Sequence, residues 1–206
     1  MRDFVRLLMK RHRGWPWPEN IFDCLTLLYG ADGWCRSCGM ALGDQTGPLT
    51  LRKSGLTVHG AWQPNWFFDF LCVAPAVAEK VDGLFDLKLR PIAWPSPKTD
   101  DRAFQIVVPT VGERWYDPVE LDAACRQRHG SPGERCPRCQ TWRWYPLIDP
   151  PPPRFFDGHS NVAIANSPEI FGSGLSAFRK ILVRRELAEL LAAASPRDFY
   201  VREVAS

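Results

Sequence analysis

Two CxxC pairs are the residues of this chain whose types and spacing most clearly suggest metal chemistry. They are Cys35-Arg36-Ser37-Cys38 and Cys136-Pro137-Arg138-Cys139, in turns at residues 34–39 and 135–140 that we call the two knuckles. A two-residue spacer lets a tight turn present both thiolates to one ion, and Gly39 and Pro137 suit such turns. Four thiolates form the complete ligand set of a tetrahedral structural zinc. The sequence therefore predicts one zinc site made by Cys35, Cys38, Cys136 and Cys139.

The distance between the pairs is the unusual feature of this motif. Residues 39–135, 97 in all, separate them, whereas compact zinc patterns have roughly 15 to 20 residues between the pairs. Two other interpretations of the pairs exist. A thioredoxin-like redox site needs only one CxxC at the start of a helix, which neither pair shows. Rubredoxin-type iron uses similar turns, and spacing alone does not separate it from zinc.

The composition is that of a globular protein. The 206 residues are 45% hydrophobic and 24% charged, which is ordinary for a folded chain, and no low-complexity linker divides them. We expect a single domain over 1–206. No apolar run of membrane-spanning length and no signal peptide are present, so we expect a cytoplasmic protein without a membrane span. The remaining cysteines are predicted to be reduced and buried: Cys24, Cys72 and Cys125.

The formal charge of +3 is unevenly distributed. The first fourteen residues hold five cations and one acid, so the remaining chain carries −1. A dedicated nucleic-acid-binding protein would normally show a broad basic surface. The second basic stretch lies around Trp142 and Trp144 and contains Arg126, Arg128, Arg135, Arg138 and Arg143. Exposed aromatics beside arginines can stack bases, but we favour a half-buried strand whose arginines are solvated.

The hydrophobic patterns predict alternating short helices and strands. A short basic amphipathic helix is expected over residues 4–8, and a second over 21–29, with Asn20 as its N-cap and Gly30 at its end. A third helix should follow Asp117-Pro118, which combine a capping residue with proline at the first helical position. Strands are expected at 49–51, 56–58, 66–73 and 104–108, and residues 150–153 should form an extended proline spacer.

An internal echo relates residues 70–92 to residues 180–204. Both segments have the pattern strand, helix, strand, and Val77 and Val81 of the first correspond to Leu187 and Leu191 of the second. Apolar residues four positions apart mark one helix face. The predicted fold class is therefore mixed α/β (α+β), with two similar β-α-β units joined by a split four-cysteine zinc knuckle pair.

This order of parts resembles the double-CXXCG motif family of myxobacteria, some of whose members are immunity proteins against swarming-inhibition toxins. The resemblance is carried by Cys35 to Gly39, Phe70 to Ile92, Cys136 to Cys139 and Lys180 to Val204. It implies that the four cysteines are metal ligands. The chain departs from the family pattern at Gln140, where glycine is expected, and in its basic, Trp-Pro-rich opening through Trp17.

The resulting hypothesis is a non-enzymatic zinc-binding protein that binds and neutralises a cognate toxin. Interfaces of this kind depend on aromatic anchors, and five tryptophans are candidates: Trp15, Trp17, Trp62, Trp66 and Trp94. The alternative hypothesis is a zinc-ribbon module that binds nucleic acid or acts in transcription. The partner, its binding surface, the oligomeric state and the role of the basic N-terminal helix stay open.

Catalysis is not indicated by any familiar motif. The sequence contains no His-Glu-x-x-His, nucleophile elbow, Walker loop or dinucleotide fingerprint. Its four histidines are scattered without ligand spacing: His12, His59, His129 and His159. We therefore name no catalytic residue and no cofactor besides structural zinc.

Overall fold

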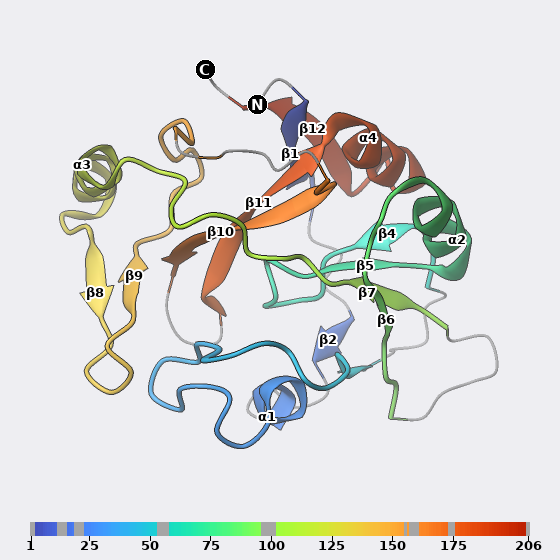
Figure 1. The fold of residues 1–206 in the computed structure, drawn as a ribbon, viewed down its shortest axis with the longest axis horizontal. Coiled ribbons are helices and arrows are strands. Elements are labelled where there is room, and N and C mark those ends of the chain that lie inside the picture. The colour runs from blue at the N-terminus through green and yellow to red at the C-terminus, as the bar shows by residue number, and fades with distance from the viewer. Residues whose placement is uncertain are drawn as a thin grey trace.

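The fold was obtained as a computed structural model in which residues 3–11, 16–18, 23–52, 58–95, 102–154, 156, 161–172 and 176–204 are described. Within these residues the chain forms a mixed α/β structure with four helices and three sheets (Figure 1). The helices are α1 (Asp23–Tyr29), α2 (Pro75–Leu84), α3 (Pro118–His129) and α4 (Arg185–Ala194). None of them has the length and hydropathy needed to cross a bilayer.

The largest sheet has six strands in the order β12-β1-β11-β10-β9-β8. The N-terminal strand, β1, lies inside this sheet, because it pairs antiparallel with both β11 and β12. In chain order the strands are β1 (Phe4–Met9), β8 (Gly133–Arg135), β9 (Trp142–Trp144), β10 (Ile164–Phe171), β11 (Phe178–Arg184) and β12 (Phe199–Glu203).

A second sheet has four strands in the order β4-β5-β7-β6, and a third consists of β2 and β3 alone. These strands are short, and each pairing within them is antiparallel. The four-stranded sheet contains β4 (Ala61–Trp62), β5 (Leu71–Val73), β6 (Leu89–Pro91) and β7 (Phe104–Ile106), while the small sheet joins β2 (Trp17–Pro18) to β3 (Leu51–Arg52).

The two larger sheets share one arrangement of strands around a helix. In the smaller, β5 leads into α2 and then β6, and both strands flank the antiparallel β7. In the larger, β11 leads into α4 and then β12, and both flank the antiparallel β1. In each sheet the first strand also pairs with the strand that precedes it in the chain, β4 or β10.

One hydrophobic core joins these two parts. Helices α2 and α4 lie side by side (Figure 1). The apolar positions that correspond in the sequence echo are all buried in the same cluster, Val77 and Val81 from α2 and Leu187 and Leu191 from α4. The helices thus cover their sheets with the faces that the four-residue periodicity predicts.

The predicted helix over residues 4–8 is wrong, because this segment is strand β1. Val5, Leu7 and Met9 stand at alternate positions of the segment, and all three contact the core shared by α2 and α4. Hydrogen-bonding partners on both sides outweigh the weak helical preference of a short segment, since strand formation depends on its neighbours. Residues 4–9 are therefore a strand of the sheet and not a basic amphipathic helix.

Other element boundaries differ from the sequence predictions. The expected strand over 66–73 is a strand only at 71–73, and residues before it form turns. The strands expected at 49–51 and 104–108 are found at Leu51–Arg52 and Phe104–Ile106. The predicted N-cap Asn20 and most of the strand expected at 56–58 lie outside the described residues. Gly30 ends α1 as predicted, with φ of 80° and its N–H bonded to Thr26 O.

Candidate metal centre

The two CxxC knuckles have the same backbone hydrogen bonds. In the first, Cys35 N donates to Met40 O at 2.7 Å and Gly39 N donates to Cys35 O at 2.7 Å. In the second, Cys136 N donates to Thr141 O at 3.0 Å and Gln140 N donates to Cys136 O at 2.9 Å. Each turn thus folds back on its first cysteine, which places both sulfur atoms of a pair on one side.

The residue after each pair adopts a left-handed backbone conformation. Gly39 has φ of 71° and Gln140 has φ of 62°, although a non-glycine residue there is uncommon. The Gln140 side chain supports the turn, since its Nε2 donates to Pro137 O at 2.8 Å. The departure at Gln140 from the expected CxxCG pattern therefore changes the residue and leaves the turn geometry intact.

The fold brings the four predicted ligands together. All four sulfur atoms lie within 4.8 Å of one another. Cys35 Sγ is 3.9 Å from Cys136 Sγ, and Cys38 Sγ is 3.5 Å from Cys139 Sγ. Four sulfurs each about 2.3 Å from a tetrahedral ion would lie about 3.8 Å apart. The cluster can therefore hold a metal ion, and its thiols are free of disulfides.

The cluster is largely shielded from solvent. Cys35, Cys38 and Cys136 are buried and Cys139 is half-buried, and Met40 and Ile170 pack against them. Burial raises the pKa of the Cys38 thiol, whereas hydrogen bonding from the backbone N–H of Cys139 lowers the pKa of Cys136 to about 6. The backbone of the second knuckle thus favours the thiolate form that metals bind.

Three parts of the chain that are distant in sequence meet at this cluster. The first knuckle follows α1, the second connects β8 to β9, and Ile170 belongs to β10. Figure 1 shows the loop after α1 beside the end of the β8–β9 hairpin. The cluster therefore links the N-terminal part of the chain to one end of the six-stranded sheet.

The half-buried strand predicted around Trp142 and Trp144 is β9, but its arginine is more buried than its tryptophans. Arg143 is buried and its Nη2 donates to Glu134 Oε1 at 2.6 Å, whereas Trp142 and Trp144 are half-buried and pack edge to face. The expectation that the arginines of this strand are solvated is wrong for Arg143. The other arginines of the stretch are exposed, as expected, and Arg126 also forms an ion pair with Asp122 one helical turn earlier.

The tryptophans proposed as anchors separate by exposure. Trp62 and Trp94 are buried in the core beneath α1, at 1% and 8% exposure. Trp17 and Trp66 are each 39% exposed, and their ring centroids lie 5.9 Å apart. Trp15 lies outside the described residues. An exposed tryptophan pair thus remains from the five candidates.

The other candidate residues take no part in the cluster. Cys24, Cys72 and Cys125 are buried and form no disulfide with a described residue, as predicted. His129 hydrogen-bonds to Pro146 O, while His12 and His159 fall outside the described residues. Sequence reasoning did not predict that Arg128 and His129 meet Lys180 at a cavity between β1 and β11. Lys180 was named only as the boundary of a repeated segment.

Comparisons of the chain with protein-family models, with curated proteins and with solved structures found no match. The geometry of the centre is that of four converging cysteines able to hold a metal ion.

Proposed function

We propose that the four cysteines hold a structural zinc ion and that the protein acts by binding another protein, as an immunity protein does when it neutralises a toxin. The observation that carries this proposal is the closed four-cysteine cluster, with sulfur pairs 3.9 and 3.5 Å apart. Four cysteine ligands complete the tetrahedral coordination of zinc, so they leave no position for a substrate or a reactive water. Such a centre stabilises a fold.

The metal is identified by elemental analysis of the purified chain. We expect one zinc per chain, lost when a strong chelator is added. One iron per chain, with the visible absorption of an iron–thiolate centre, would overturn the assignment of zinc while leaving the cysteine site in place. A chain that carries no stoichiometric metal after purification and reconstitution would overturn both.

The exposed tryptophan pair supports a role in protein binding. Trp17 lies on β2 and Trp66 lies in the turn before β5, and the two rings contact each other at the surface. Tryptophan is enriched among the residues that dominate binding energy at protein interfaces. A paired and partly exposed tryptophan surface is therefore a suitable anchor for a partner.

The backbone at Trp66 is strained, and the residue is 39% exposed. Trp66 has φ of 72°, a conformation that costs a bulky residue about 1 to 3 kcal/mol. The neighbouring Asn65 is buried, and its N–H donates to Pro16 O at 3.0 Å. Strain of this kind persists where the surrounding structure enforces it, often at functional positions.

A growth assay with the product of the neighbouring reading frame tests the proposal. That product should arrest growth when expressed alone, and co-expression of this chain should restore growth through a stable complex. Absence of a toxic neighbour, or rescue without complex formation, would contradict the proposal.

In the W17A/W66A double variant we expect affinity for the partner to fall by about 2 kcal/mol, roughly 30-fold. Leu84→Ala, at an exposed leucine of α2, serves as the control and should retain binding.

We also infer that the segments β5-α2-β6 and β11-α4-β12 are two similar β-α-β units. Their common strand order, each with one antiparallel strand inserted between the two parallel ones, supports this inference. The paired apolar positions on α2 and α4 support it as well.

A further inference from the structure

A cavity lies where the six-stranded sheet divides. Strands β1 and β11 pair only at Phe4–Arg184 and Val5–Val183. Beyond this point β1 continues beside β12 and β11 continues beside β10. A hollow of about 970 Å³ opens between them, lined by four successive residues from each strand, Arg6–Met9 and Phe178–Ile181. Because consecutive residues of both strands line it, the cavity lies in the plane of the sheet and is not confined to one face.

Much of the lining is apolar. Leu8 and Met9 from β1 and Phe178 and Ile181 from β11 face Phe68 and Leu71 from the segment that enters β5. Helix α3 and the loop 146–149 complete the opposite side. A cavity of this size with mainly apolar walls suits a small organic molecule.

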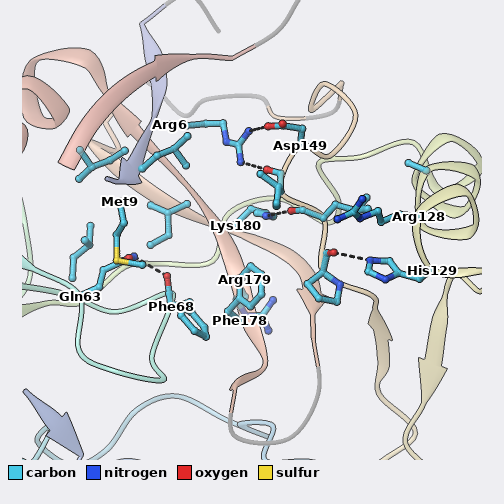
Figure 2. Close-up of a pocket in the computed structure, with 18 of the residues that line it drawn as sticks. Arg6, Met9, Gln63, Phe68, Arg128, His129, Asp149, Phe178, Arg179 and Lys180 are labelled. Carbon is cyan, nitrogen blue, oxygen red and sulfur yellow. Dashed lines mark hydrogen bonds and ion pairs between the residues drawn. The ribbon is translucent and has the colours of Figure 1, made fainter. Parts of the chain in front are cut away.

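One side of the cavity gathers cationic groups along the loop 146–149. Figure 2 shows side chains from three elements reaching three successive carbonyls of this loop. His129 Nε2 hydrogen-bonds to Pro146 O at 2.9 Å, Lys180 Nζ donates to Leu147 O at 2.6 Å and Arg6 Nη2 donates to Ile148 O at 2.7 Å. These carbonyls orient the donors without neutralising them.

The charges around the cavity are not balanced. Asp149 is the only acid among the lining residues, and it is engaged by Arg6 and by Arg202 outside the cavity. Within the part of the chain that is described, Lys180 forms no ion pair, and its Nζ lies 5.3 and 5.0 Å from the ring centroids of Phe171 and Phe178. Burial, with a smaller effect of Arg6, lowers the pKa of Lys180 to about 7. An ammonium group so placed lacks the counterion that buried charges usually have.

We propose that this cavity binds a small amphiphilic anion, an apolar chain that ends in a carboxylate. The apolar part would lie between β1 and β11, and the carboxylate would meet Lys180 and the lining residue Arg128 of α3. Charged hydrogen bonds from lysine and arginine to a carboxylate are the strongest that such a site offers. The site is distinct from the cysteine cluster and does not depend on the proposed protein partner.

The test compares two molecules with the same twelve-carbon tail and opposite head charge, dodecanoate and dodecyltrimethylammonium, each below its micelle-forming concentration. The full metal-bound chain is titrated at pH 6.5, where Lys180 is mostly protonated. We expect saturable binding of dodecanoate at least about tenfold tighter than that of the cation, with backbone amide NMR shifts at residues 6–9 and 178–181. Absence of saturable binding, equal binding of both molecules, or amide shifts confined elsewhere would overturn the proposal.

Two variants locate the head group. Lys180→Met keeps an apolar side chain of similar length and should weaken dodecanoate binding at least about tenfold. Arg128→Gln alters an exposed residue and should weaken binding without changing the fold, whereas Arg126→Gln on the same helix, outside the cavity lining, is the control. If Lys180→Met and Arg128→Gln both bind dodecanoate as the unmodified chain does, the assignment of the carboxylate end is wrong.

Discussion

Replacing one cluster cysteine by serine should release the metal and lower stability together. Cys35→Ser and Cys139→Ser each leave three thiolates, and structural zinc in small sites contributes on the order of 10 kcal/mol to folding. We expect substoichiometric metal and a clear fall in melting temperature. Cys125→Ser is the matched control, because Cys125 is a buried cysteine outside the cluster. Full metal content and an unchanged melting curve in Cys35→Ser would rule out a shared site.

Gln140 occupies a backbone conformation that glycine adopts more readily. With φ of 62°, a glutamine there carries a conformational cost of about 1 to 2 kcal/mol. Gln140→Gly relieves that cost, but it removes the exposed hydrogen bond from Nε2 to Pro137 O and gives more freedom to the unfolded chain. We therefore expect a stability between unchanged and about 1 kcal/mol higher. Gly39→Ala at the equivalent position of the first knuckle should be destabilising. Urea unfolding of metal-bound protein measures both, and a marked loss in Gln140→Gly would contradict this account of the turn.

Lys180 should make stability depend on pH. Its pKa falls from 10.5 to about 7 on folding, so between these values the unfolded chain binds more protons than the folded one. The free energy of unfolding should then rise with pH across this window. The charged and titratable residues that line the cavity with Lys180 are Arg6 from β1, Arg179 from β11, Arg128 and His129 from α3, and Asp149 from the loop 146–149.

The comparison that isolates this effect is with Lys180→Met. Urea unfolding at pH 7.5 and 9.5 should show the unmodified protein gaining stability relative to the variant at the higher pH. Both proteins contain His129 and the other lining groups, so the comparison isolates what Lys180 contributes. A difference that stays constant between the two pH values would mean that Lys180 is not buried as described.

Helix α3 is the element that positions Arg128 and His129 at the cavity, and its ends are defined by local chemistry. Asp117 accepts hydrogen bonds from Val119 N and Glu120 N, Pro118 begins the helix, and Gly130 ends it with φ of 78°. Each of these signals is present in the sequence, which is why this helix was predicted correctly.

Removing the N-cap should weaken α3 by a measurable amount. Asp117→Ala loses both hydrogen bonds to the first turn, and we expect a cost of about 1 kcal/mol in urea unfolding. Asp122→Ala, which removes an exposed ion pair with Arg126 in the same helix, should cost less than about 0.5 kcal/mol. Equal effects of the two substitutions would show that the cap is not a specific support of the helix.

Strand β1, unlike α3, owes its conformation to distant parts of the chain. Five of its six residues are apolar, and so short an apolar run fits a helix or a strand equally well. The segment becomes a strand because β11 and β12, which come from the far end of the chain, supply pairing partners on both of its sides. No local signal in residues 4–9 contains that information.

At the scale of the whole molecule, the four-cysteine cluster brings together segments 101 positions apart, and a bound metal ion would tie them to each other. Closing a loop of about 100 residues by a cross-link removes roughly 5 kcal/mol of unfolded-state entropy in the chain-entropy treatment of disulfides. The main core, in contrast, contains no cluster cysteine and is formed by α2, α4 and the sheets that they cover. The centre should therefore stabilise one side of the molecule more than the other.

Chelation should then loosen the molecule unevenly. On addition of a strong zinc chelator, hydrogen exchange should increase first at the two knuckles and the residues beside them, 34–41 and 133–144. Residues of α2, α4 and β11 should keep most of their protection, because the core that holds them does not include the metal site. Simultaneous and equal loss of protection everywhere would show that the metal is required for the whole fold.

The sequence by itself determined the features that depend on neighbouring residues. These include the paired cysteines in tight turns, the caps of α3, the end of α1 at Gly30 and the apolar faces of α2 and α4. Each follows from residue type and spacing within a few positions, where backbone conformation and side-chain hydrogen bonds are local.

The tertiary structure alone decided which distant groups meet. It brought Cys35 within 3.9 Å of Cys136, made a strand of residues 4–9, left Trp17 and Trp66 exposed while burying Trp62 and Trp94, and opened a cavity beside Lys180. Burial and strand pairing are set by the partners that a segment finds across the chain. Residue patterns limit those partners without selecting among them, because the free energy of each contact depends on the packing of all the others.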